Sequence, residues 1–105
     1  MNGVEVLAYV PDLMDRSKVG AAAAVTFVAR ASELASLARP GQVVVVDLNR
    51  PGVLDALPQV VGTGARVVAF GSHVERATLE AAAALGCQAL PRSQFFRSLG
   101  ALLSP

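Results

Sequence analysis

Short apolar runs rich in β-branched residues alternate regularly with longer segments that have helical periodicity, and this alternation constrains the fold more than any other feature. Such runs, bounded by turn residues, predict strands that are buried on both faces. Strict strand–helix alternation predicts parallel strands joined by right-handed crossovers, with helices on both faces of the sheet. The expected strands are Val4–Val10, Val25–Ala29, Val43–Val46, Val67–Phe70 and Gln88–Leu90.

The first helix is expected over Asp12–Ala23, with Asp12 as its N-cap. At helical spacing, its small residues predict an inward face suited to close packing on a sheet, and its charged residues predict an outward face. The expected inward residues are Leu13, Ser17, Gly20, Ala21 and Ala24, and the expected outward residues are Asp15, Arg16 and Lys18.

Four further helical segments follow the same logic. Ser32 is expected to cap a short second helix, and Ser93 is expected to cap the fifth. The third helix is expected over about Val53–Val61, and the fourth over Glu75–Leu85, where Gly86 ends it. The buried face of the fifth helix should consist of Phe95, Leu99, Leu102 and Leu103.

The composition bounds the class of protein. With 105 residues the chain is long enough for one domain with a real core, and we expect a single domain over residues 1–105. Charged residues are only 16% of the chain, which predicts apolar surface that is covered by a protein partner or a second copy. The net charge of +1, without a basic cluster, argues against nucleic acid as a ligand.

Targeting signals and cysteine chemistry are also restricted. No apolar run reaches the roughly 20 residues of a membrane span, and Met1–Val10 lacks the pattern of a signal peptide, so we expect a cytoplasmic protein without a membrane partner. The single cysteine, Cys87, excludes an internal disulfide and a cysteine-based zinc site. We expect Cys87 to be a packed thiol.

In a doubly wound sheet, ligands bind beyond the carboxyl ends of the strands, where the strand order reverses. The residues expected there are Val10-Pro11-Asp12 after the first strand and Asp47-Leu48-Asn49-Arg50-Pro51 after the third. The run from Val43 to Gly52 resembles the phosphorylation segment of the receiver domains of bacterial response regulators, with Asp47 at the phosphoacceptor position and Pro51 four residues later.

This resemblance covers essentially the whole chain. It implies an α/β fold of the flavodoxin-like receiver type, a three-layer αβα sandwich around a five-stranded parallel sheet of order 2-1-3-4-5. Asp12 stands where receivers keep an acid after the first strand, and Ser72 where they keep a Ser or Thr after the fourth. Magnesium is the one cofactor the resemblance leaves open. Its ligands would be the carboxylates of Asp12 and Asp47 and a backbone carbonyl near Asn49.

Two residues of the receiver pattern are missing. The second acid after the first strand is replaced by Pro11, or by Val10 if the register slips, which predicts weaker metal binding. The lysine after the fifth strand is absent, and Arg92 is the nearest substitute, able to pair with Asp47 or a phosphoryl group. The pattern therefore resembles a degenerate, stand-alone pseudo-receiver.

Alternatives remain for the site residues. Asp47 has a structural interpretation, as an aspartate that ends a strand and bonds the following turn. Ser72, His73 and Asp47 would be a poor hydrolytic triad, because the serine and histidine are adjacent in sequence; we expect His73 at the pocket rim.

Three functions follow. The first is a non-catalytic regulatory module that docks to a protein or forms a homodimer through the Glu75–Leu103 face, and is not an enzyme. The second is a phosphoacceptor that reacts at Asp47 with Mg²⁺. The third is a small-molecule sensor or enzyme that uses the crevice at the carboxyl ends of the strands.

Overall fold

The fold was analysed in a computed structural model that describes residues 5–104. A single sheet of five parallel strands has the order β2-β1-β3-β4-β5, which confirms the predicted α/β, flavodoxin-like topology. The strands lie within or close to the expected runs, although Val4 falls outside the described residues. Their bounds are β1 Val6–Tyr9, β2 Val25–Phe27, β3 Val43–Asp47, β4 Arg66–Gly71 and β5 Gln88–Pro91.

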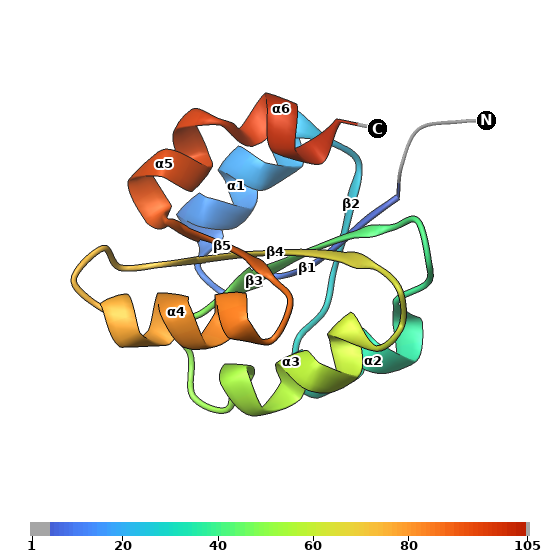
Figure 1. Cartoon of the computed structure of the whole chain (residues 1–105). Coiled ribbons are helices and arrows are strands. Elements are labelled where there is room, and N and C mark those ends of the chain that lie inside the picture. Colours follow the sequence, from blue (N-terminus) through green and yellow to red (C-terminus); the bar gives the residue numbers. More distant parts are fainter. Residues whose placement is uncertain (1–4, 105) are drawn as a thin grey trace.

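Helices cover both faces of the sheet and make three layers (Figure 1). One face carries α1, α5 and α6, and the other carries α2, α3 and α4. A 3-10 helix, η1, leads into α2. The bounds are α1 Leu13–Ala22, η1 Ala31–Glu33, α2 Leu34–Leu37, α3 Val53–Val61, α4 Arg76–Ala84, α5 Arg92–Arg97 and α6 Leu99–Leu103.

The central strand β3 shows why valine runs suit this fold. Its side chains alternate between two cores, so that Val43 and Val45 pack with α1, α5 and α6 while Val44 and Val46 pack with α2, α3 and α4. All five residues of β3 are buried. The edge strand β2 differs from the expectation, because Thr26 is exposed and the strand pairs only with β1. Helices bury the two faces of a parallel sheet, and they cover an edge strand less completely than a central one.

The orientation of α1 also differs from the expectation. Its buried residues are Asp15 and Val19, whereas Leu13, predicted to face inward, is 76% exposed. Ser17, Gly20, Ala21 and Ala24 are exposed as well. Leu13 and Met14 have larger apolar side chains than Val19 and are left exposed, so apolar area alone does not set the orientation of this helix. The burial of Asp15, predicted to lie outside, depends on the ion pair described below.

Two predicted helix caps are wrong. Ser32 lies inside η1, where the carboxylate of Glu33 accepts the backbone N–H groups of Ala29 and Arg30 instead. Ser93 lies inside α5, because that helix begins at Arg92 and Pro91 occupies the N-cap position.

The remaining helix predictions agree well with the structure. α3 has its predicted bounds, and Gly86 follows α4 in the left-handed region, at φ 105°. Phe95, Leu102 and Leu103 are buried as expected, whereas Leu99 is only partly buried. The predicted fifth helix is interrupted at Ser98 into α5 and α6. Among residues 5–104, no helix has the length and apolar character needed to cross a bilayer.

Candidate functional site

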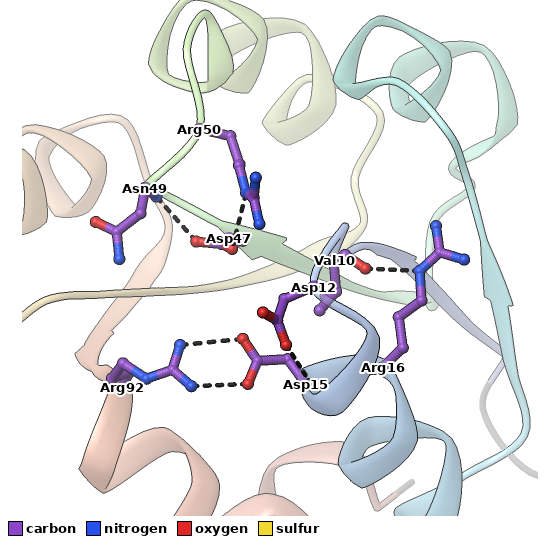
Figure 2. Close-up of polar contacts among 8 residues, drawn as sticks. All are labelled: Val10, Asp12, Asp15, Arg16, Asp47, Asn49, Arg50 and Arg92. Atoms are coloured by element: carbon purple, nitrogen blue, oxygen red, sulfur yellow. Dashed lines mark hydrogen bonds and ion pairs between the residues drawn. The ribbon is translucent and has the colours of Figure 1, made fainter.

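The tails of β1 and β3 lie next to each other, as the predicted site requires. Tyr9 and Val46 are paired in the register of the two strands, so the chain leaves both strands at the same edge of the sheet. Asp47 is the last residue of β3, and Asp12 follows β1 as the N-cap of α1. Figure 2 shows both carboxylates on this edge, together with the guanidinium groups of Arg50 and Arg92.

Asp47 is buried, with 4% of the residue exposed, and both its carboxylate oxygens are engaged. Oδ1 accepts the backbone N–H of Asn49 at 2.9 Å, which closes the turn after the strand. Oδ2 lies 3.5 Å from Nε of Arg50, which is three residues further along the chain and has a partly exposed side chain. The structural interpretation of Asp47, as a strand-ending residue that bonds its own turn, is therefore satisfied.

Asp12 has an N-terminal capping role that the sequence predicted. Its Oδ1 accepts the backbone N–H of Asp15 at 2.9 Å. This hydrogen bond is the main cause that lowers the pKa of Asp12 below its ordinary value, and the nearby charges of Arg50 and Arg92 lower the pKa further. The exposed carboxylate of Asp12 thus lies in the field of both arginines.

The strongest polar contact at this edge joins Asp15 and Arg92. Nη2 of Arg92 lies 2.7 Å from Oδ1 of Asp15, and Nη1 lies 3.0 Å from Oδ2, which is a bidentate pair. Asp15 is only 3% exposed. The hydrogen bond to Asp15 is the main cause that raises the pKa of Arg92, and the charges of Asp15, Asp47 and Asp12 contribute. Arg92 was predicted to be available to Asp47, but it is bonded to Asp15 (Figure 2).

Arg92 also packs against aromatic rings. Its guanidinium carbon lies 5.0 Å from the ring centroid of Phe96 and 5.7 Å from that of Phe70. Nζ of Lys18 also lies 5.0 Å from the Phe96 centroid. The Phe70 and Phe95 rings stack at 4.6 Å. An arginine held by a carboxylate and two rings has little freedom to reach other partners.

The sequence analysis missed Asp15 as a site residue, and it placed Arg50 at this edge without predicting its contact with Asp47. Asp15 sits in the first turn of α1, three residues after the capping Asp12, so its position beside the carboxyl edge could be read from the sequence. Its partner could not, because Arg92 is separated from it by 77 residues. The contact of Arg50 could have been found from its spacing of three residues from Asp47.

Ser72 and His73 follow β4 at the same edge but do not join Asp47. The hydroxyl oxygen of Ser72 accepts the N–H of Val74 at 3.4 Å, and His73 is exposed. Within residues 5–104, no hydrogen bond links either side chain to Asp47, so the catalytic triad that the sequence analysis judged poor is not assembled. The same described range contains no group of three His, Cys, Asp or Glu side chains arranged to hold a metal ion.

A groove of about 470 Å³ opens at this edge on the side of α2 and α3. It lies where the chain leaves β1, β2 and β3, at the point where the strand order reverses. Its polar lining comes mainly from Tyr9, Arg30, Ser32, Asp55 and Gln59. A smaller cavity of about 240 Å³, lined by residues such as Glu5, Thr26 and Gln42, lies at the opposite edge of the sheet.

Cys87 is buried, and desolvation raises the pKa of its thiol, in agreement with the predicted packed cysteine.

The fold is shared with solved structures of pilus assembly proteins. A protein of Sinorhizobium meliloti described as the pilus assembly protein CpaE2 is 19% identical in sequence, with a TM-score of 0.65, over 91% of this chain and 97% of that one. The pilus assembly protein CpaE of Caulobacter crescentus is 18% identical, with a TM-score of 0.62, over 97% of this chain and 95% of that one. No family model matches the sequence, and no curated protein matches it. At these identities the likeness concerns the fold.

Proposed function

We propose that this chain is a receiver-like regulatory module that acts by docking to a protein and does not itself catalyse a reaction. The observation that supports the proposal most directly is the occupied carboxyl edge. Both oxygens of Asp47 have partners, and Arg92, the cation at the position of the receiver lysine, is bonded to Asp15. The cation that would stabilise a transferred phosphoryl group must be free to reach it, and Arg92 is held by two hydrogen bonds to Asp15.

Electrostatics add to this argument. A phosphoryl group on Asp47 would place roughly two negative charges close to the exposed carboxylate of Asp12. Receiving them would require Arg92 to leave Asp15, and a buried carboxylate without its partner is costly. The two solved neighbours, described as pilus assembly proteins, favour a module that works within a protein assembly.

Mass spectrometry tests the absence of phosphorylation. After incubation with acetyl phosphate and Mg²⁺, we expect the mass of the protein to be unchanged, both for the natural sequence and for Asp47→Ala. A stable gain of one phosphoryl group that is lost in Asp47→Ala would overturn the proposal. The variant Asp12→Ala serves as a second control, because a magnesium-dependent reaction at Asp47 should slow when that carboxylate is removed.

A phosphoacceptor is the second candidate, and the burial of Asp47 at the end of β3 favours it. In that case Asp12 would help to hold Mg²⁺, Ser72 would bind a phosphoryl oxygen and Arg92 would exchange Asp15 for the phosphoryl group. The phosphorylation experiment separates the two candidates.

We further propose that docking uses the Glu75–Leu103 face and that the protein pairs with a second copy there. β5 is an edge strand of the sheet, and Leu85, at the end of α4, is 36% exposed. Multi-angle light scattering at high protein concentration should show a dimer, and Leu85→Glu should convert it to a monomer. Leu37→Glu is the matched control, since Leu37 is 47% exposed on α2, outside this face. A monomeric natural protein would contradict the proposal.

The groove beside Tyr9 and Arg30 favours a third candidate, a small-molecule sensor or enzyme. A thermal-shift screen with nucleotides, phosphosugars and metal ions tests it, because a ligand that binds only the folded state raises the melting temperature. A specific shift that disappears in Tyr9→Ala or Arg30→Ala would support a ligand site in this groove, and the absence of any shift would argue against it.

A further inference from the structure

The segment that follows β5 is held by side-chain anchors rather than by its own helical stability. α5 has six residues and α6 has five, and the backbone leaves the helical conformation between them at Ser98, with φ −110° and ψ 16°. Helices this short are not stable alone in water. The position of the segment on the sheet therefore depends on the contacts its side chains make.

The two helices use different anchors. α6 buries Leu102 and Leu103, and the carbonyl oxygen of Leu102 accepts a hydrogen bond from Nη1 of Arg66 at 2.8 Å. α5 buries Phe95, which stacks on Phe70, and its first residue is Arg92. In Figure 1, α1 lies on the same face of the sheet as α5 and α6.

We infer that the Asp15–Arg92 pair is a latch that fixes the start of α5 on the first turn of α1 and so sets the position of the α5–α6 segment. The pair is bidentate, and it joins elements at opposite ends of the chain. Lys18 and Arg92 both contact the ring of Phe96, which adds a second link between α1 and α5.

The latch is asymmetric. The side chain of Asp15 is 5% exposed, whereas that of Arg92 is 41% exposed. The latch therefore opens by movement of Arg92, and it leaves behind a buried carboxylate that needs a new partner. Any anionic group that attracts Arg92 at this edge acts on both α1 and α5, which makes the pair a conformational link between the carboxyl edge and the Glu75–Leu103 face.

The Asp15–Arg92 pair is present without a phosphoryl group on Asp47, so the existence of the latch does not depend on whether Asp47 accepts one. Its consequence for docking rests on the function proposed above. Two measurements separate the latch from the docking proposal. Backbone hydrogen exchange reports on the latch in any oligomeric state, and light scattering reports on pairing.

Hydrogen exchange of the full chain tests the latch with four variants. Asp15→Asn removes the buried charge, and Arg92→Gln removes its partner. The double variant Asp15→Asn/Arg92→Gln removes both and avoids an unpaired buried charge. Arg66→Ala is the matched control, because it removes an arginine contact to α6 and leaves no buried carboxylate.

We expect amide exchange in residues 92–97 and 13–19 to rise about tenfold or more in Arg92→Gln and in the double variant, with α3 unchanged. A smaller rise in the same two segments is expected in Asp15→Asn. Arg66→Ala should affect α6 and the start of β5, where Arg66 also binds Gln88, and should leave residues 92–97 and 13–19 unchanged. If Arg92→Gln does not fold, the double variant and Asp15→Asn decide the question. Unchanged exchange in both segments of those two variants, or the same pattern in Arg66→Ala, would overturn the inference.

Discussion

Two ion pairs lie at the same edge of the sheet, and they differ in contact geometry and in the sequence separation of their partners. Asp47 and Arg50 are three residues apart and share one contact of 3.5 Å. Asp15 and Arg92 share two contacts, of 2.7 and 3.0 Å, across 77 residues of sequence. Both carboxylates are buried and both arginines are partly exposed, so burial alone does not separate the pairs.

The difference shows that two ion pairs at one edge of a sheet can have different structural roles. The carboxylate of Asp47 closes the turn after β3 through the N–H of Asn49, and the local pair with Arg50 adds one contact within the same turn. The distant pair joins two helices and positions the segment that carries much of the proposed docking face. Loss of a single long contact to a partly exposed arginine should change the free energy of unfolding little. Loss of a bidentate contact should change it more. Four predictions test this comparison.

The largest effect is expected for Arg92→Ala. It leaves the carboxylate of Asp15 buried without a partner, and we expect the free energy of unfolding in urea to fall by roughly 2–4 kcal/mol, below the range for fully buried pairs because Arg92 is partly exposed. Asp15→Asn should lower the free energy of unfolding much less, because water can hydrate the freed guanidinium of Arg92. Equal costs for the two variants would contradict the asymmetry of the pair.

Asp47→Ala should have the next largest effect. The N–H of Asn49 loses its acceptor in a partly buried turn, and the free energy of unfolding should fall by about 1–2 kcal/mol. Asp47→Asn keeps an acceptor at this position and removes the charge. If the backbone bond matters more than Arg50, as the distances indicate, Asp47→Asn should remain close to the natural protein in chemical denaturation.

Asp12→Asn should give a smaller effect that depends on pH. The folded-state pKa of Asp12 is depressed below its ordinary value of 3.8, so its charge stabilises the fold above that pH. This contribution is lost as the pH falls through the folded-state pKa. Asparagine also caps helices but does not titrate. The difference in stability between the two proteins, measured by thermal unfolding from pH 7 to pH 2, should therefore shrink below pH 3.8. A difference independent of pH would show that the charge has no role.

The smallest effect is expected for Arg50→Ala, at about 0–1 kcal/mol in urea unfolding. The guanidinium of Arg50 is partly exposed, and its one contact with Asp47 is long. Added salt should reduce this small difference further because exposed charges are screened. A cost comparable to that of Arg92→Ala would mean that the local pair is as important as the distant one.

The sequence by itself determined the layout of the molecule. The valine runs predicted the strands, strict alternation predicted their parallel direction, and together with the resemblance they predicted the strand order 2-1-3-4-5. The placement of Asp47 and Asp12 at neighbouring strand ends followed from the same pattern, since the carboxyl ends of parallel strands meet at one edge. These features depend on residues close in sequence and on the sharp contrast between valine and polar side chains.

Only the tertiary structure decided which face of α1 is buried and which acid Arg92 binds. Leu13, Met14 and Val19 point in three different directions around this helix, so the sequence has no single apolar face and periodicity could not identify the buried one. The ion pair supplied what the apolar pattern lacked, because a carboxylate is buried only where a cation meets it. That cation comes from the far end of the chain, and no local pattern around Asp15 encodes its position.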